Sequence, residues 1–253
     1  MPFTPTHIIA IVPFAKFARS LPISALAIGS MIPDLPMFFP AISSYHASHS
    51  FPGLFLYCLP AGLIAFLFFQ LAAKEACIAL LPLFAQQRVQ HLKQRYIPVT
   101  SGALFFVVLA IVIGSATHIS WDSFTHKGGW GTVQFSALNQ TIDLTGCTLP
   151  GYKLLQYGST LLFFPLLLLL AYRWLRRQPP DTGHCSPLSP TAKRLVLAVI
   201  LLTPVVLAIA LSLLSNQSAY ILLGKTIRFS GSIWLLSLVV YSLLFRFRTQ
   251  GST

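Results

Sequence analysis

The chain has 253 residues, of which 55% are hydrophobic and only 9% charged, with a mean hydropathy of +0.74. A soluble domain of this size carries about a quarter charged residues, so the composition excludes an ordinary soluble protein. The formal net charge of +12 raises the question of nucleic-acid binding. The basic residues, however, stand in short clusters between apolar segments, which is typical of membrane topology signals. We therefore expect an integral membrane protein whose partners are membrane lipids and not nucleic acid.

The first 34 residues predict two short helices. Residues 5–19 would form about four helical turns, and a second apolar segment runs from Ile23 to Asp34. At 1.5 Å per residue each segment is about 20 Å long, too short to cross a hydrocarbon core of about 30 Å. We expect a short N-terminal helical hairpin covered by other helices, followed by a loop over residues 35–50.

Five longer apolar stretches follow, each close to the length of about 18 residues or more that a membrane-spanning helix needs. The first is expected to kink at Pro60. The stretches cover residues 51–73, 100–117, 154–172, 195–214 and 227–245.

The segments between these stretches are more polar. Residues 74–98 are interpreted as a loop with a short interfacial helix, and residues 127–153 as irregular chain. Residues near 173–194 form a linker rich in Pro and Ser. The expected fold is all-α: a polytopic membrane helical bundle of about five full spans plus the N-terminal hairpin. It would comprise a region with a His/Asp cluster (1–153) and C-terminal transmembrane helices (154–253).

Basic residues predict the orientation. If the linker near 173–194 is cytoplasmic, alternation of the spans places on that side all 17 Lys and Arg except Lys127, Lys153, Lys225 and Arg228. The opposite face, which we expect to be the outer face of a bacterial inner membrane, then receives most of the histidines. Lys225 and Arg228 on that face could bind an anionic substrate headgroup, although contact with ordinary lipid headgroups explains them equally well.

The segment from Gly114 to Gly131 holds His118, Asp122 and His126 at four-residue spacing. On a helix each step of four turns the direction by only about 40°, so the three side chains project along one stripe. Imidazole and carboxylate ligands suit a divalent cation such as zinc. Because the chain has only five Asp and Glu, an Asp between two histidines favours a metal site. For any one of these histidines alone, capping of a helix end at the interface is the simpler interpretation.

The N-terminal segments offer further ligands for the same site. His7, Asp34 and one of His46 or His49 could close it from the opposite side. Asp34 could also simply end a helix by bonding local N–H groups in the turn around it. With a metal bound, an activated water would be the nucleophile and a spare Asp or His the general base. The predicted catalytic residues are Asp122, His126 and Asp34.

Four blocks of the sequence, MPFTPTH, LPISALAIGSMIPDLPMF, HSFPGLFLYCLP and THISWDSFTHKGGW, resemble the DUF4184 family of bacterial membrane proteins. The blocks lie within residues 1–131, and the C-terminal spans match in general character only. The pattern is also similar to that of membrane-bound metal-dependent hydrolases, with an N-terminal TH, a PD turn and a later HxxxD. The HxxxD element resembles the ligand helix of zinc-dependent phospholipase C. These resemblances imply metal ligands in this chain: His118 and Asp122, with His126, His49, Asp34 and His7 as further candidates.

Two functions remain open at this point. The first is a metal-dependent hydrolase with a zinc cofactor, acting on a lipid or a lipid-linked phosphate or ester. The second is a non-enzymatic membrane transport, metal-handling or scaffold protein whose polar cluster binds ions or headgroups. A hydrolase requires at least three side chains that converge on one metal position with an open coordination site. A transporter predicts a polar path that reaches both faces, and a scaffold predicts neither.

Overall fold

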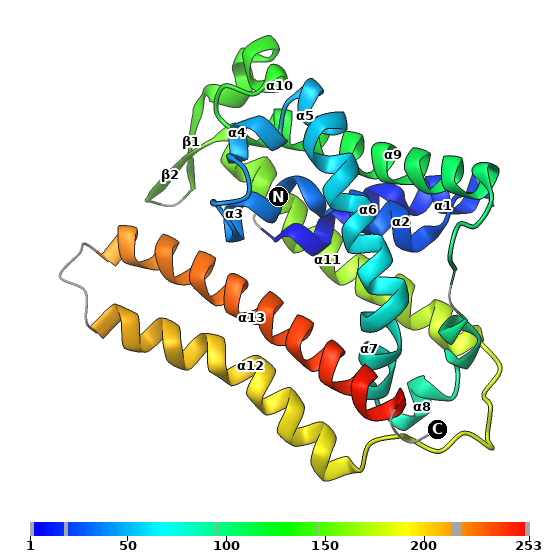
Figure 1. Ribbon diagram of the computed structural model, residues 1–253. Helices are drawn as coiled ribbons and strands as arrows, with labels where there is room; N and C mark the ends of the chain where they lie inside the picture. Colours follow the sequence, from blue (N-terminus) through cyan, green and yellow to red (C-terminus); the bar gives the residue numbers. More distant parts are fainter. Residues whose placement is uncertain (1–2, 18–19, 95, 145, 214–218, 251–253) are drawn as a thin grey trace. The chain divides into compact units, whose positions relative to one another are not determined.

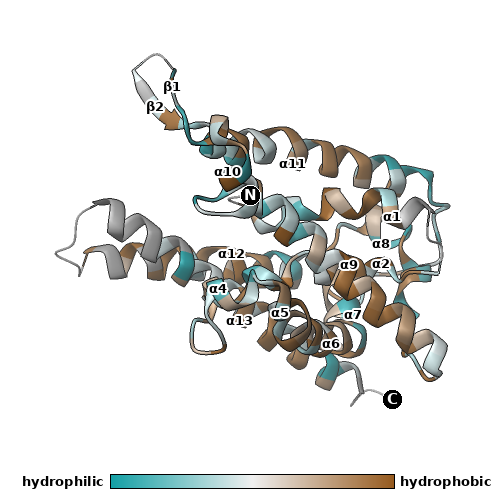
Figure 2. Ribbon diagram, turned by 90° about the horizontal axis from the view of Figure 1, so that it is seen from above, coloured by the Kyte–Doolittle hydropathy of each residue, from teal (hydrophilic) through white to brown (hydrophobic). Residues whose placement is uncertain are grey.

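The computed structural model describes residues 3–17, 20–94, 96–144, 146–213 and 219–250 (Figure 1). Among these residues, five helices are long and apolar enough to cross a membrane, and apolar residues run along them (Figure 2). The predicted all-α membrane bundle is therefore confirmed, and the chain is a multi-pass membrane protein. The five helices span Phe51–Leu80, Ser101–Gln134, Gly151–Arg177, Pro190–Leu207 and Arg228–Thr249.

The chain separates into two compact units, and three of the boundaries fall inside the helices α3 (Leu35–Phe38), α6 (Leu59–Phe68) and α11 (Gly151–Arg177). The division predicted at residue 153 stays a sequence-based prediction. The first unit contains Met1–Pro36, Pro40–Phe66 and Pro98–Trp174. The second contains Met37–Phe39, Leu67–Ile97 and Leu175–Thr253.

The N-terminal hairpin is short, as predicted, and its apolar helices do not reach the length of a membrane span. It begins with a 3₁₀ helix, η1 (Thr4–Ile11), before the α-helices α1 (Val12–Phe17) and α2 (Ile23–Gly29) and a 3₁₀ turn, η2 (Ile32–Asp34). In a 3₁₀ helix, residues three apart lie directly above one another. Thr4 and His7 therefore project from the same side of η1.

The loop predicted over residues 35–50 is wrong in part, because it contains the one-turn helices α3 (Leu35–Phe38) and α4 (Tyr45–Ser48). The Ser44 hydroxyl caps α4 by accepting a hydrogen bond from the Ala47 N–H at 3.1 Å. Such capping lets a single turn form in a segment whose Pro and Ser content predicts a loop.

The first span is longer than predicted. It runs through α5 (Phe51–Gly53), the π-helical η3 (Leu54–Cys58), α6, the π-helical η4 (Phe69–Ala73) and α7 (Lys74–Leu80). Residues 74–80 continue the helix because the charged amino group of Lys74 has hydrogen-bond acceptors within reach. Its Nζ donates to Gln70 Oε1 and to the Gln94 carbonyl, both at 2.6 Å. The predicted short helix after the span corresponds to α8 (Leu83–Gln86), which is followed by the 3₁₀ turn η5 (Gln90–Lys93).

The second span, α9 (Ser101–Thr125), packs against α2 and α6 around the core of the first unit. Ile111, Val107, Leu26 and Phe66 are fully buried there. The predicted span over residues 100–117 is extended by two more turns, and these carry the His/Asp stripe.

The segment 127–153, predicted to be irregular, contains regular structure. It forms α10 (Trp130–Gln134), the 3₁₀ turn η6 (Ser136–Asn139) and an antiparallel hairpin of β1 (Thr141–Leu144) with β2 (Cys147–Pro150), in which Thr141 pairs with Pro150. Gly146 permits the hairpin turn because its φ of 93° is strained for other residues. The remaining helices, α11, α12 (Pro190–Leu213) and α13 (Ala219–Gln250), each exceed the predicted span.

Candidate metal centre

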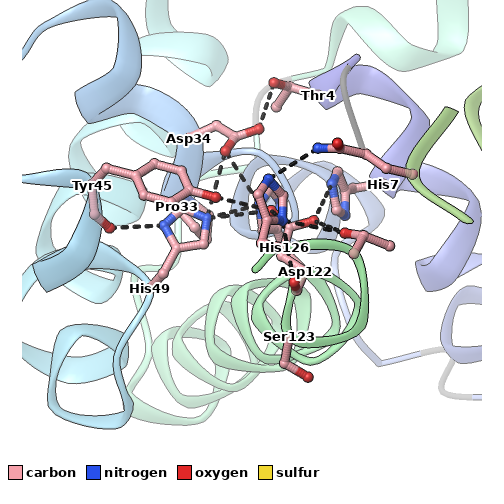
Figure 3. Close-up of polar contacts among 12 residues, drawn as sticks. Thr4, His7, Pro33, Asp34, Tyr45, His49, Asp122, Ser123 and His126 are labelled. Atoms are coloured by element: carbon pink, nitrogen blue, oxygen red, sulfur yellow. Dashed lines mark hydrogen bonds and ion pairs between the residues drawn. The ribbon is translucent and has the colours of Figure 1, made fainter. Parts of the chain in front are cut away.

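Four acidic and imidazole side chains of the first unit converge on one point (Figure 3). Asp34 comes from η2, His49 from the end of α4, and His118 and Asp122 from α9. One ligand atom of each lies within 4.8 Å of all the others. His118 is fully buried and the two carboxylates are 4% exposed. Charged and polar groups buried in this way need partners or a bound ion.

Five of the six separations between these atoms match a tetrahedral metal site. With metal–ligand bonds of about 2.0–2.2 Å, the ligand atoms of a tetrahedral zinc site lie about 3.3–3.6 Å apart. His118 Nε2 lies 3.3 Å from His49 Nε2, 3.4 Å from Asp34 Oδ1 and 3.5 Å from Asp122 Oδ2. His49 Nε2 lies 3.6 Å from both carboxylate oxygens. The four residues therefore fit a divalent cation.

A backbone carbonyl contacts the Nδ1 atom of each of the two imidazole rings and fixes the orientation of the ring. His118 Nδ1 lies 2.7 Å from the Ser30 carbonyl, and His49 Nδ1 lies 3.0 Å from the Tyr45 carbonyl. Because a carbonyl only accepts hydrogen bonds, each Nδ1 carries the proton, and the lone pair of each Nε2 faces the other ligands. Two lone pairs that face each other at 3.3 Å repel unless a cation or a proton lies between them. This is the arrangement that metal-ligating histidines use.

The two carboxylates are held in the same way. Asp34 directs Oδ1 toward the centre, while its Oδ2 accepts a hydrogen bond of 2.6 Å from the Thr4 hydroxyl. Asp122 directs Oδ2 toward the centre, while its Oδ1 lies 3.4 Å from His7 Nε2. Thr4 and His7, aligned by the 3₁₀ geometry of η1, thus orient one carboxylate each.

Protonation follows from burial and from these contacts. Burial works against ionisation of Asp34, but His118 and His49 keep its pKa well below the usual range. Burial alone would lower the pKa of His49, yet its contacts with Asp122 and Asp34 raise it above 6.5. Burial, aided by the neighbouring His118, lowers the pKa of His7 to about 2. His7 is therefore a neutral ring, and it stacks on His118 with centroids 3.6 Å apart.

The position of His118 depends on a close contact between α2 and α9. A Cβ at Gly114 would lie 2.3 Å from the Leu26 carbonyl oxygen, and one at Gly29 would lie 2.4 Å from that of Ile111. Small residues of this kind let membrane helices approach backbone to backbone. The approach brings the end of α2, with the Ser30 carbonyl, within hydrogen-bonding distance of His118.

Of the six predicted metal ligands, His7 and His126 lie outside the group of four. His7 contacts Asp122 from behind. His126 ends α9 with its Nδ1 3.2 Å from the Asp122 carbonyl and its Nε2 3.0 Å from Gln156 Nε2. Of the two alternatives on α4, the structure brings in His49, whereas His46 is exposed.

Tyr45 supports the centre and was not predicted from the sequence. Its hydroxyl donates to Asp122 Oδ2 at 3.3 Å, and its ring stacks on His49 with centroids 3.8 Å apart. Ser44 is a residue type that caps helices. A capped turn after Ser44 is the sequence signal that could have placed Tyr45 and His49, which are four residues apart, on the same side of one helical turn.

The predicted headgroup residues belong to the second unit. Arg228 is exposed on α13, and the side chain of Lys225 lies outside the described residues. Their role therefore stays a prediction. An apolar cavity of about 600 Å³, lined by Phe14, Trp121 and Leu155 among others, lies along α9 but includes none of the four converging residues.

The family of the chain follows from comparison with known proteins. A family model described as a domain of unknown function, DUF4184, matches residues 1–243. The match extends well beyond the four blocks within residues 1–131 and includes the C-terminal helices. Neither a curated protein nor a solved structure matches the chain. The chain belongs to the DUF4184 family, and its buried Asp and His residues could hold a metal ion.

Proposed function

We propose that this protein is a membrane-embedded, metal-dependent hydrolase that acts on a lipid or a lipid-linked phosphate or ester. The observation that carries the proposal is the convergence of Asp34, His49, His118 and Asp122, with five of their six separations at 3.3–3.6 Å, the range of a tetrahedral site. Two nitrogen and two oxygen ligands suit zinc, the metal that we propose.

In this proposal the four converging residues hold the ion, which would acidify a water molecule and polarise the bond to be broken. Asp34 and Asp122 were predicted to be catalytic as well. Because Thr4 and His7 engage their second oxygens, we now assign both carboxylates to ion binding. His126, the third predicted catalytic residue, is 34% exposed beside Asp122, so it has the freedom to exchange protons with a substrate or water.

The proposed substrate class follows from the position of the centre. His118 and Asp122 lie in a helix that qualifies as a membrane span, and a substrate that reaches them from the bilayer would itself be a lipid. The distribution of basic residues supports the non-cytoplasmic face of a bacterial inner membrane. A water-soluble substrate would have no comparable reason to meet a centre built into a span.

One observation favours the alternative function in metal handling or scaffolding. Four protein ligands complete a tetrahedron, and structural zinc sites are closed in this way, whereas catalytic sites keep a position for water. The two functions differ in a measurable property. A hydrolytic centre must accept an additional oxygen ligand, while a closed centre must not.

The first experiment measures the metal content of the full-length protein purified in detergent. We expect near-stoichiometric zinc in the wild type and its loss in His118→Ala and Asp122→Ala. His46→Ala removes an exposed imidazole from α4 and should keep the metal. If the wild type binds no zinc, manganese or other divalent ion while all variants remain folded, the proposal fails.

Hydrolysis is then tested on the metal-loaded protein. Reconstituted wild type and His118→Ala would be incubated with a bacterial lipid extract, and the products followed by mass spectrometry. The proposal predicts the appearance of a hydrolysed species with the wild type and none with the variant. A metal-loaded protein that releases no product and accepts no added oxygen ligand would support the alternative.

A further inference from the structure

The centre is closed on most sides and most accessible at one edge. Among the described residues that contact Asp122, His7, His118 and Thr125 are fully buried. Tyr45 is 37% exposed and the side chain of His126 is 34% exposed. Their ring centroids lie 6.1 Å apart at an interplanar angle of 50°, so these two rings form adjoining walls of the same edge. A ligand that approaches the centre from this side contacts these rings first.

One wall offers a hydrogen-bond donor beside the centre. The Tyr45 hydroxyl donates to Asp122 Oδ2, the carboxylate oxygen that faces the other ligands (Figure 3). A cation bound by Oδ2 would compete for that oxygen, and the phenolic proton would then be available to an oxygen atom of a ligand. Stacking on His49 keeps the Tyr45 ring in place.

Behind the other wall lies a positive charge. Lys153 Nζ donates to Gln156 Oε1 at 2.8 Å, so the amide of Gln156 directs its Nε2 toward His126 Nε2, 3.0 Å away. Within the described part of the chain, no carboxylate lies within ion-pair distance of Lys153. Headgroup binding was predicted for Lys225 and Arg228, whereas Lys153 had no predicted role.

The balance of charge at this edge selects the ligand. Asp34 and Asp122 together carry two negative charges, which a bound divalent cation neutralises, and Lys153 then leaves a positive surplus. A positively charged edge that carries a hydrogen-bond donor favours an anion whose oxygens only accept hydrogen bonds. A neutral ester gains nothing from the charge of Lys153.

We infer that the edge between Tyr45 and His126 binds a phosphate-type oxyanion, with the Tyr45 hydroxyl as a donor and Lys153 as the attracting charge. The inference rests on the proposed metal centre and narrows its substrates to phosphate-bearing compounds. The oxyanion could come from a phosphorylated lipid headgroup or from free phosphate, and both present the same oxygens to this edge.

The test uses the full-length protein in detergent, loaded with Co²⁺, whose visible absorption reports the ligands around the ion. Inorganic phosphate is titrated, and the wild-type spectrum should change with saturation. A hydrogen bond to a charged group is worth about tenfold or more in affinity, so Tyr45→Phe should weaken phosphate binding by about that factor. Lys153→Gln should weaken it by about three- to tenfold, with a smaller loss as salt is added.

Two matched variants control for the substitutions themselves. Tyr172→Phe makes the same change on an exposed tyrosine of α11, and Lys127→Gln removes an exposed lysine close to His126 in the sequence. Both should bind phosphate within about twofold of the wild type, as expected for surface substitutions. All variants should retain cobalt, because none removes one of the four converging residues.

The two sources of phosphate are separated with nanodiscs. Protein in phosphatidylcholine discs that contain phosphatidic acid is compared with protein in pure phosphatidylcholine discs titrated with inorganic phosphate. A spectral change with phosphatidic acid alone identifies a lipid headgroup, and a change with inorganic phosphate alone identifies the free anion. Either result supports the inference.

Two results would overturn it. If the wild type retains cobalt but responds to neither phosphate source, the edge does not bind oxyanions, although the metal centre stands. If Tyr45→Phe and Lys153→Gln both respond like the wild type, these residues do not form the binding edge. Failure of the wild type to bind any divalent ion would remove the metal centre itself, and this inference with it.

Discussion

Both units bury polar side chains, but they use them differently. In the second unit the buried polar groups bind backbone carbonyls or a neighbouring amide: Gln86 donates to the carbonyls of Ala79 and Leu81, and Ser242 donates to that of Leu238. In the first unit, two carboxylates and two imidazole nitrogens face one another. The comparison shows that buried polarity alone does not mark a site. A site is marked by groups whose remaining lone pairs converge on one point.

The largest effect on metal binding is expected at the close contact between α2 and α9, which only the first unit needs for its site. Gly114→Ala places a methyl group 2.3 Å from the Leu26 carbonyl oxygen, which should force α2 and α9 apart. We expect a loss of about 1–3 kcal/mol in stability from overpacking, together with loss of the metal as Ser30 leaves His118. Thermal unfolding in detergent and metal content measure the two effects.

Gly102→Ala is the matched control for Gly114→Ala. It lies on the same helix, where a Cβ would meet no atom within 4 Å. It should keep the metal and change stability by less than about 0.5 kcal/mol, as expected for an exposed position at the start of a helix. Equal behaviour of the two variants would contradict the proposed role of the close contact.

The second prediction concerns the residues behind the ligands. Thr4→Val keeps the shape of the side chain but removes the hydroxyl that holds Asp34 Oδ2. Loss of such a supporting hydrogen bond typically costs about 10–100-fold in metal affinity. Competition with a fluorescent zinc chelator should show this loss without a large change in unfolding temperature. An unchanged affinity would mean that Thr4 serves the fold and not the centre.

The third prediction is that metal affinity depends on pH, a property that the second unit should not show. Although burial disfavours the charged form, the contacts of His49 with Asp122 and Asp34 raise its pKa, so below that pKa the metal-free centre holds a proton that a cation must displace. Affinity should therefore be full above that pKa. It should fall as the pH drops below it, by about tenfold per pH unit for each proton displaced. Calorimetric titration of zinc in buffers of different ionisation enthalpy counts the released protons, and a count of zero would contradict the prediction.

The sequence predicts the spans well, because length and hydropathy decide which segments cross a bilayer. The stripe with His118 and Asp122 also follows from helical spacing alone. The sequence could not show that His49 and not His46 belongs to the group of four, because this choice depends on a single capped turn at Ser44. The same stripe includes His126, which ends α9 and turns to Gln156. The four-residue spacing of the stripe does not show where α9 ends, so it cannot show that His126 lies outside the group of four.

The supporting residues were beyond prediction for a different reason. Thr4 and His7 are aligned more closely in the 3₁₀ helix than they would be in an α-helix, and nothing in the local sequence shows that they face Asp34 and Asp122. Tyr45 is brought to Asp122 across 77 positions of sequence. Such contacts depend on how α2, α4 and α9 pack, which no local pattern contains.

The smallest effect is expected on the lipid-exposed faces of the second unit. Leu201 is 57% exposed on α12. Because lipid chains are as apolar as leucine, Leu201→Ala should change the unfolding free energy by less than about 0.5 kcal/mol and leave metal content unchanged. Ile111→Ala in the first unit removes a fully buried side chain and should cost about 2–5 kcal/mol. Unfolding in detergent mixtures compares the two. A large effect of Leu201→Ala would show that this face packs against protein and not lipid, and that the second unit contributes more than a set of spans.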